Sequence, residues 1–471
     1  MISKRPSKSK SERSPIAPSK SGKNNRSPVR SLVIGFGLTA IALVSASVGA
    51  LLAVSLSSAP LRQSNLSPEE AKVFDTRQTI AYRNLQFPAL SRPVNILVVG
   101  TKVLTSDVPE AKTEDVGYHA LVDSFDGLTD TMLLLRFDPA SKKLTMLSIP
   151  RDTRTNIEGY GERKINEANS LGGPALTAET VSELLGGVAI DRYVRVNVQG
   201  LEKLIDALGG VTIDVPKDMK YNDFSQHFYI DLKKGKQHLD GAKAVQFSRF
   251  RHDAYGDIGR VQRQQQLMRA VMEQALQPGA LLKIPDILKV IQTHIDTNLT
   301  LEELLALAGF ATEVDRSNLQ MVLLPGDFSG DGHKSVSYWL PNEEKIQDIA
   351  ARYFDHGQVN ISDNATENLR ITVQDSLDDP DAVRSMVRSL ETAGYHNIIV
   401  ARSKVDPPET TKIIAQNGDD RAAATLRGSI GIGEVLVEST GNLASDVTIQ
   451  LGRDWQNQSG RSPDSGTASD R

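Results

Sequence analysis

The stretch "RYVRVNVQGLEKLIDALGGVTIDVP", from Arg192 to Pro216, contains the pattern that decides the fold. A β-branched run at 192–198 is followed by a periodic run at 201–210, and a second β-branched run begins at Val211. These runs predict a strand, a helix and a strand. Two parallel strands need such a crossover connection, so the stretch predicts an α/β protein with a parallel sheet.

The same alternation continues on both sides of this stretch. Apolar runs of strand length alternate with periodic runs of helical length, and Thr177 and Gly186 carry the start and stop signals of one such helix. The expected strands lie at 95–100, 131–137 and 143–150, and the other expected helices lie at 260–276, 301–310 and 342–354. We therefore expect an α/β/α sandwich, in which helices cover both faces of one sheet.

The chain of 471 residues is too long for one compact core. After a polar linker at 355–368, a smaller rhythm at 369–454 predicts a second α/β domain with the order strand, helix, two strands, helix, two strands. The Ser-, Gly- and Asp-rich tail at 455–471 is expected to be disordered. Cysteine is absent, which excludes disulfides and thiolate metal sites.

The N-terminal part predicts a membrane anchor. Residues 1–30 carry nine Lys or Arg against one Glu, a net charge of +8, which leaves −12 for the rest of a chain whose total is −4. Such a head is expected to be disordered and cytoplasmic, because positive flanks stay inside. Residues 31–58 contain no charge and are long enough for a transmembrane helix, whereas the apolar region of a cleavable signal peptide spans about 7–15 residues. A linker at 59–91 then leads to the large domain at 92–354, which is expected outside the cell.

Four arginines between Phe247 and Leu267 indicate an anionic partner. Because the large domain is expected outside the cell, where there is no nucleic acid to bind, this partner is not nucleic acid. Arg249 and Arg251 are two residues apart, and an extended backbone would point both toward one anion. Guanidinium groups match phosphate oxygens two at a time, so a pyrophosphate would satisfy several of them. A helix from about Ile258 would provide its N-terminus beside the same anion.

Charged residues also stand at the ends of two expected strands. Asp130 precedes the strand at 131–137, and Arg151 and Asp152 directly follow the strand at 143–150. Ligands of α/β sheets collect beyond the carboxyl ends of strands, which favours a site at this edge. Each of these residues alone also fits an ordinary surface ion pair or a turn brace. Their combination with the arginine stretch favours a phosphate-binding site.

Several motifs together resemble those of the LytR-CpsA-Psr family. "NILVVG", "TDTMLLLRFDP", "KLTMLSIPRDT", "KINEANSLGG", "DALGGV" and "DIGRVQRQQQL" occur in the family's order within residues 92–277. The segment 369–454, ending in "VTIQLGRDW", is similar to the small C-terminal domain of many such proteins. The family's enzymes are anchored in the cell membrane and have an α/β sandwich with an apolar pocket for a polyprenyl chain.

The resemblance implies a phosphotransferase of the cell envelope. Such an enzyme moves a glycopolymer from a polyprenyl-pyrophosphate carrier to peptidoglycan, with a phosphodiester link to the 6-hydroxyl of N-acetylmuramic acid. The implied catalytic residues are Asp130, Arg151, Arg249, Arg251, Asp257, Arg260 and Gln264. The further candidates for phosphate binding are Lys102, Lys164 and Arg263. Asp130 would hold Mg²⁺ or act as a base toward the sugar hydroxyl.

Two departures from the family pattern concern this site. The family usually has Gly-x-Asp after the first strand, and that aspartate helps to bind Mg²⁺, whereas residues 100–102 here read Gly-Thr-Lys. Either Lys102 supplies the missing positive charge, or a carboxylate from the following loop replaces the ligand. The loop candidates are Asp107, Asp123 and Asp126. Residues 128–129 read Leu-Thr where members often carry Arg-Ser, so one phosphate contact is expected to be absent.

Other functions remain as alternatives to transfer. Water in place of the sugar hydroxyl would make the protein a polyprenyl-pyrophosphate hydrolase, and a site without chemistry would make it a binding protein for lipid-linked glycans. Control of transcription is disfavoured, because the basic head contains no helix-turn-helix. The sequence leaves open the polymer, the exact acceptor hydroxyl, the need for Mg²⁺, the role of the C-terminal domain and the oligomeric state.

Overall fold

The computed structural model describes residues 61–459 except for a set of gaps. These gaps are residues 62, 75–80, 83–87, 103–124, 224–227, 251–255, 316–317, 330–337, 358–368, 403–406, 417, 439 and 443–444. The chain divides into two units, Met1–Ser58 and Ala59–Arg471, and all described residues lie in the second. The head and the transmembrane helix expected at 1–58 therefore lie outside the described residues. Within the described ranges, every helix is too short or too polar to cross a membrane.

A mixed six-stranded sheet forms the centre of the N-terminal part. Its strands, in spatial order, are β13 (Ile295–Thr297), β8 (Arg192–Asn197), β3 (Val94–Lys102), β4 (Leu128–Asp138), β5 (Lys143–Ile149) and β14 (Leu319–Leu323). The pairs β3–β8 and β5–β14 are parallel, and the other neighbours are antiparallel. The three strands expected from apolar runs at 95–100, 131–137 and 143–150 are confirmed.

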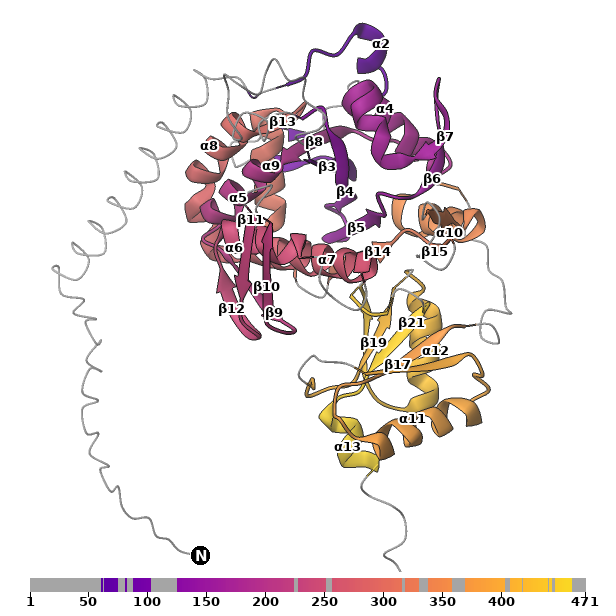
Figure 1. Ribbon diagram of the computed structural model, residues 1–471. Helices are drawn as coiled ribbons and strands as arrows, with labels where there is room; N and C mark the ends of the chain where they lie inside the picture. The colour runs from indigo at the N-terminus through magenta and orange to yellow at the C-terminus, as the bar shows by residue number, and fades with distance from the viewer. Residues whose placement is uncertain are drawn as a thin grey trace, which may run out of the picture. The chain divides into compact units, whose positions relative to one another are not determined.

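Helices cover both faces of this sheet, as Figure 1 shows. On one face, Leu97 and Val99 of β3 share a buried cluster with residues of α4 (Ala168–Leu184) and α10 (Glu343–Phe354). Their neighbours Ile96 and Val98 point to the opposite face because side chains alternate along a strand. The helices of that face are α5 (Val198–Ala207), α7 (Gly256–Ala275) and α9 (Leu301–Ala311). The predicted α/β sandwich is confirmed.

The strand–helix–strand stretch expected at residues 192–216 folds differently from the expectation. β8 lies in the central sheet, but β9 (Val211–Val215) pairs antiparallel with β12 (Gly235–Leu239) in a separate sheet. The reason is that β3 and β13 already occupy both edges of β8. β9 also alternates between buried and exposed residues, which suits a sheet with one covered face better than a central parallel strand.

The helix expected at 177–186 begins earlier than its start signal. α4 runs from Ala168 and contains a kink at Gly173, whose φ of 66° is strained for any residue with a side chain. The Thr177 hydroxyl donates a hydrogen bond to the Gly173 carbonyl at 2.7 Å, so Thr177 lies inside the helix and is not its cap. The expected end is confirmed, since Gly186 follows with φ 73°.

The remaining elements of the N-terminal part are short and surround the sheet. They are α2 (Pro68–Ala71), β1 (Ala81–Tyr82), β2 (Ala89–Leu90), β6 (Arg154–Ile157), β7 (Gly161–Lys164), η3 (Ile165–Glu167), β10 (Met219–Asp223), β11 (Phe228–Leu232), α6 (Gly241–Arg249), η4 (Pro278–Lys283), α8 (Ile284–His294), β15 (Gly326–Phe328) and β16 (Trp339–Pro341).

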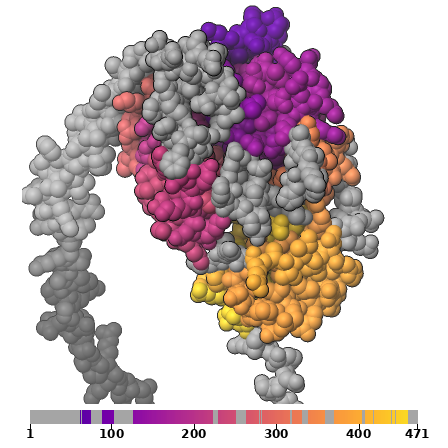
Figure 2. Space-filling view, in the orientation of Figure 1, coloured from indigo at the N-terminus to yellow at the C-terminus, as the bar shows by residue number. Residues whose placement is uncertain are grey.

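The C-terminal part has a five-stranded sheet and a core of its own. Its elements are β17 (Ile371–Asp375), α11 (Pro380–Thr392), β18 (Ile398–Arg402), β19 (Lys412–Ala415), α12 (Asp420–Ile430), β20 (Glu434–Val437), β21 (Val447–Gln450) and α13 (Arg453–Ser459). The expected order of strands and helices is confirmed, and the space-filling view in Figure 2 shows these residues, in orange and yellow, as a closely packed body.

α13 covers the first residues of the tail that was expected to be disordered. The Trp455 indole is buried and donates a hydrogen bond to the carbonyl of Ala382 at 3.0 Å. This apolar anchor orders the helix up to Ser459.

Candidate functional site

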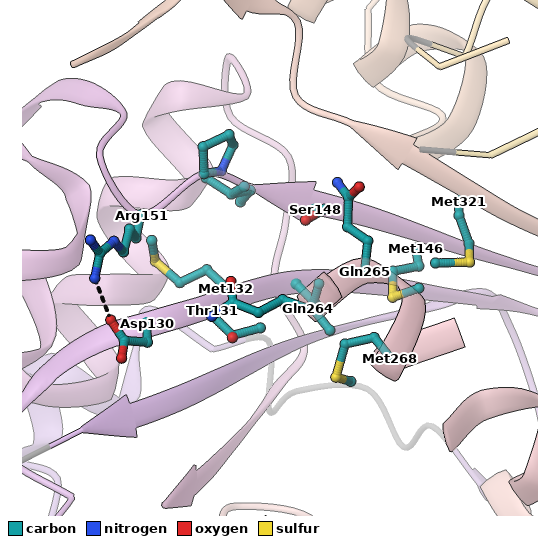
Figure 3. A pocket seen from close by; sticks show the side chains of 13 residues that line it. Asp130, Thr131, Met132, Met146, Ser148, Arg151, Gln264, Gln265, Met268 and Met321 are labelled. Atoms are coloured by element: carbon teal, nitrogen blue, oxygen red, sulfur yellow. Dashed lines mark hydrogen bonds and ion pairs between the residues drawn. The ribbon is translucent and has the colours of Figure 1, made fainter. Parts of the chain in front are cut away.

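The charged residues expected at two strand ends meet in the structure. β4 and β5 are antiparallel neighbours, so the start of one strand lies beside the end of the other. The Arg151 guanidinium binds the Asp130 carboxylate with 2.6 Å between Nη1 and Oδ1 (Figure 3). Arg151 Nε also lies 3.4 Å from the Asp152 carboxylate, which in turn binds the Lys164 ammonium at 2.7 Å. These four residues form a partly exposed chain of alternating charges.

A large cavity of about 300 Å³ lies on the α7 face of the sheet. Its walls are mainly aliphatic side chains of β3, β8, α5, α7 and the segment around β13. These include Val98, Val194, Val196, Leu201, Leu204, Leu267, Val271, Ile291, Ile295, Leu299 and Leu304. Its polar lining includes Asp130, Arg249 and Gln264. The cavity therefore combines a long apolar surface with a carboxylate, a guanidinium and an amide.

Helix α6 places Arg249 at the cavity. The Asp240 side chain caps this helix by accepting a hydrogen bond from the Lys243 backbone at 2.9 Å. The helix ends at Arg249, and Phe250 is extended. Arg249 thus lies at a helix end and not in the extended segment that the sequence analysis assumed. Arg251 lies outside the described residues.

Helix α7 provides Gln264 and begins slightly before the expected start at Ile258. Leu267 and Val271 follow Gln264 on the same face of the helix, and all three line the cavity. The backbone of Asp257 and Arg260 belongs to α7 and that of Lys102 to β3, but their side chains lie outside the described atoms.

Two candidates for phosphate binding make other contacts. The Arg263 guanidinium is buried, donates a hydrogen bond to the carbonyl of Phe250 and lies 5.6 Å from its ring. It therefore fixes the segment after α6. Arg263 is not one of the described residues that line the cavity. Lys164 binds Asp152 and lies 5.4 Å from the Tyr338 ring, so it reaches Arg151 only through the Asp152 carboxylate.

A buried ionic network that was not predicted from the sequence lies behind the site. Arg195 and Asp296 are 4% and 1% exposed, and Arg195 Nε donates to the Asp296 carboxylate at 2.6 Å. Ser64 donates to the same carboxylate through its backbone at 2.8 Å and through its hydroxyl at 2.9 Å. The sequence signal for this network is the arginine pair in "RYVRVN". A charged residue in a strand with a neighbour on each side is buried, and a buried charge must be paired.

The same network reaches the start of β4. Arg195 Nη1 donates to the Asn169 side-chain oxygen at 3.2 Å. The Asn169 amide nitrogen donates to the carbonyls of Phe125 and Gly127 at 2.7 and 2.8 Å. These carbonyls belong to the segment that leads directly into Asp130. The network therefore positions the site carboxylate through the backbone.

Burial and the neighbouring Asp296 charge raise the pKa of Tyr193 to about 12. The phenol is therefore neutral at ordinary pH and donates a hydrogen bond to Asp296 at 3.3 Å. This contact adds another donor to the buried carboxylate.

The described residues offer Mg²⁺ one carboxylate at the cavity. Asp130 lines it, whereas the exposed carboxylate of Asp126 lies 3.7 Å from Arg195, and Asp107 and Asp123 lie outside the described residues. Mg²⁺ is commonly held by one or two carboxylates together with substrate phosphates and water, so Asp130 fits this ion when a phosphate is present. Among the described residues, one cluster of acidic groups is close enough to share a cation, and it consists of Glu158, Glu179 and Glu183. This cluster does not line the cavity.

Comparisons with known proteins cover most of the chain. The family model described as the LytR_cpsA_psr family matches residues 62–354, and the model described as the LytR cell envelope-related transcriptional attenuator matches residues 368–455.

Three similar proteins show the extent of the likeness. Regulatory protein MsrR of Staphylococcus aureus (strain COL) is 38% identical over 173 residues, which are 36% of this chain and 51% of that protein. The chain thus spans about half the length of this relative. Polyisoprenyl-teichoic acid–peptidoglycan teichoic acid transferase TagU of Oceanobacillus iheyensis is 35% identical over 240 residues, 49% of this chain and 72% of the relative. The crystal structure of Bacillus subtilis TagV is 28% identical, covers 57% of this chain and 99% of its own, and has a TM-score of 0.45.

Proposed function

Because this chain belongs to the LytR_cpsA_psr family, we propose that it transfers a glycopolymer from a polyprenyl-pyrophosphate carrier to peptidoglycan. The observation that carries the proposal is the aliphatic cavity whose lining also contains Asp130 and Arg249. An isoprenoid chain needs an apolar enclosure, and a diphosphate needs guanidinium groups where that enclosure ends. The name of the relative TagU, a polyisoprenyl-teichoic acid–peptidoglycan teichoic acid transferase, supports this substrate class.

The chemistry is an in-line displacement at phosphorus. A hydroxyl of the acceptor sugar, proposed to be the 6-hydroxyl of N-acetylmuramic acid, forms a bond to the phosphorus that carries the glycopolymer. The bond from this phosphorus to the bridging oxygen breaks, and polyprenyl phosphate leaves with that electron pair. The hydroxyl proton passes to a base, and the product is a phosphodiester.

The residues of the cavity contribute charge and position. Phosphoryl transfer depends mainly on alignment and on neutralising charge on the phosphate oxygens. Arg151, which is paired with Asp130, and Arg249 of the cavity lining supply guanidinium groups, and Gln264 of the same lining supplies an amide. Asp130 is the carboxylate of the described lining, so both carboxylate roles, holding Mg²⁺ and accepting the hydroxyl proton, fall to it. When bound, Mg²⁺ would neutralise charge on the two phosphates.

The requirement for Mg²⁺ separates these two roles. We expect transfer to stop on chelation and to return with Mg²⁺, but only at a high concentration, because Lys102 stands where the family usually has a ligand. Replacing Lys102 by Asp restores a carboxylate and should lower the half-activating Mg²⁺ concentration by about tenfold or more. Steady-state rates over a Mg²⁺ titration measure both values. Full activity in excess chelator would contradict metal binding and leave Asp130 as the base.

The transfer itself is tested with the full-length protein, a polyprenyl-pyrophosphate-linked glycan and peptidoglycan. Transfer yields polymer bound to peptidoglycan and polyprenyl phosphate in equal amounts. Hydrolysis yields polyprenyl phosphate without bound polymer, and a pure binding protein yields neither. Leu201→Trp should fill part of the cavity and lower the efficiency by about tenfold or more. Leu282→Trp is the matched control, because Leu282 is 87% exposed.

We further propose that residues 31–58 anchor the protein in the cell membrane with the N-terminus in the cytoplasm and the transferase part outside. The uncharged run at 31–58 and the basic residues before it support this orientation. For the C-terminal part we propose a binding or scaffolding role, supported by its separate apolar core. A deletion from Leu369 onward that abolishes transfer in solution would contradict this role.

A further inference from the structure

A narrow second cavity of about 30 Å³ opens beside the Asp130–Arg151 pair. It shares Asp130, Thr131, Leu133, Gln264 and Met268 with the large cavity, and it extends further toward β5 and β14. At that end Met146 and Met321 are register partners on neighbouring parallel strands, and Met268 of α7 lies against them. Figure 3 shows the ion pair at one end and the methionines with Gln265 at the other.

Gln265 is the unusual residue of this cavity. It is 4% exposed and lies on the same face of α7 as Met268 and Met272, which both pack into an apolar cluster. Both of its polar atoms, Nε2 and Oε1, are buried without a hydrogen-bond partner within the described part of the chain. Burying an amide without partners is unfavourable, and nearly all buried amides in proteins are paired. The position therefore lacks the group that would complete it.

The chemistry of the missing group follows from the walls. The Gln265 amide offers a donor and an acceptor, so it can donate from Nε2 to the carbonyl of another amide or accept a hydrogen bond from the N–H of that amide at Oε1. The methionine side chains around it suit a methyl group. The volume is a few times that needed for one water molecule, which excludes a sugar ring but admits a small side group. An acetamido group combines these three properties.

We infer that this cavity is the subsite for the acetamido group of an N-acetylated hexosamine whose ring lies at the Asp130–Arg151 pair. The inference rests on the proposed function, because that reaction brings a sugar to the same pair. The sugar is either the acceptor residue of peptidoglycan or the first residue of the lipid-linked donor, and both can carry an acetamido group at carbon 2. Gln265 binds this group and thereby orients the reacting oxygen.

The test uses Gln265→Met in the full-length protein. Methionine matches the surrounding residues, so the melting temperature should stay equal or rise, which shows that the variant folds. Methionine leaves the polar group of the substrate buried without its hydrogen-bond partner, which should lower kcat/KM for transfer by roughly tenfold to hundredfold. Gln266→Met, on a neighbouring part of α7 that lines neither cavity, is the matched control and should keep the wild-type value.

Substrates without the acetyl group identify which sugar is bound. In one arm the peptidoglycan is N-deacetylated and then re-acetylated, and in the other the donor carries glucose in place of N-acetylglucosamine next to the diphosphate. In whichever arm removes the acetyl group that Gln265 binds, kcat/KM of the wild-type protein should fall to the value of Gln265→Met. The kcat/KM of Gln265→Met should not fall further in that arm. The arm in which this happens names the sugar, and re-acetylation should restore the rate on peptidoglycan.

Two results would overturn the inference. One is an unchanged kcat/KM of Gln265→Met with every substrate together with higher stability, since Gln265 would then hold only a buried water. The other is equal rates of the wild-type protein on acetylated and deacetylated substrates in both arms. A wild-type protein that transfers no polymer at all refutes the proposed function instead. The subsite is then tested by saturation-transfer NMR with the methyl glycosides of N-acetylglucosamine and glucosamine. Binding of the first alone supports it, and equal or absent binding refutes it.

Discussion

Replacing Arg151 by alanine is expected to lower the rate of polymer transfer by about 10²–10³-fold, the usual loss when one positioned donor to a charged transition state is removed. Arg151 lies between two carboxylates, Asp130 and Asp152, and its removal leaves negative charge where the phosphates must bind. The loss should appear mainly in kcat, because the apolar cavity still binds the isoprenoid chain. Steady-state kinetics with lipid-linked glycan and peptidoglycan measure it.

Two variants control this experiment. Arg151→Lys keeps the charge but loses the fork of donors, and it should recover only part of the activity. Arg163→Ala removes an arginine of nearby β7 whose ion pair with Glu167 is exposed, and it should change the rate less than twofold. If Arg151→Ala attached polymer at the wild-type rate, Arg151 would have no part in the transfer step.

The second large effect concerns the buried network. Asp296→Ala should lower the free energy of unfolding by about 3–5 kcal/mol, because it leaves the Arg195 guanidinium without its buried counter-charge and with only the exposed carboxylate of Asp126 at 3.7 Å. Urea unfolding followed by the fluorescence of Trp339, which is buried in the core against the central sheet, measures the change. A Trp455→Phe background removes the signal of the other tryptophan, which lies in the C-terminal part.

A double variant separates lost charge from lost packing. Arg195→Met combined with Asp296→Leu removes both charges and should recover most of the stability. It should not recover the rate, because Asn169 then loses the Arg195 contact that helps it to hold the segment before Asp130. A loss below about 1 kcal/mol for Asp296→Ala would show that water reaches the pair and that the network is not needed for the fold.

The sequence predicted the sandwich because its buried strands are long apolar runs and its helices are periodic. It could not predict the partner of β9, because strand pairing depends on which sheet edges remain free after folding. The antiparallel contact between β4 and β5 also could not be read from local patterns, although it is what brings Asp130 to Arg151.

The site was predicted in part for the same reason. Asp130, Arg151, Arg249 and Gln264 were identified from strand ends and family motifs, and the structure places all of them at two cavities that share lining residues. Arg263 was grouped with them because it lies in the same run, but its position on the helix turns it toward Phe250. Gln265 was not singled out, since the middle glutamine of three in a row gives no signal until its neighbours in space are known to be methionines.

The ion pair between Asp130 and Arg151 has a consequence for competition. Any anion that binds Arg151 must first replace a carboxylate that already lies 2.6 Å away, so the gain from charge alone is small. A free inorganic phosphate makes no other contact that would add binding free energy. A lipid-linked diphosphate gains further binding free energy because its hydrocarbon chain is transferred out of water. The protein should therefore ignore soluble phosphates in the medium and select ligands that arrive attached to an isoprenoid.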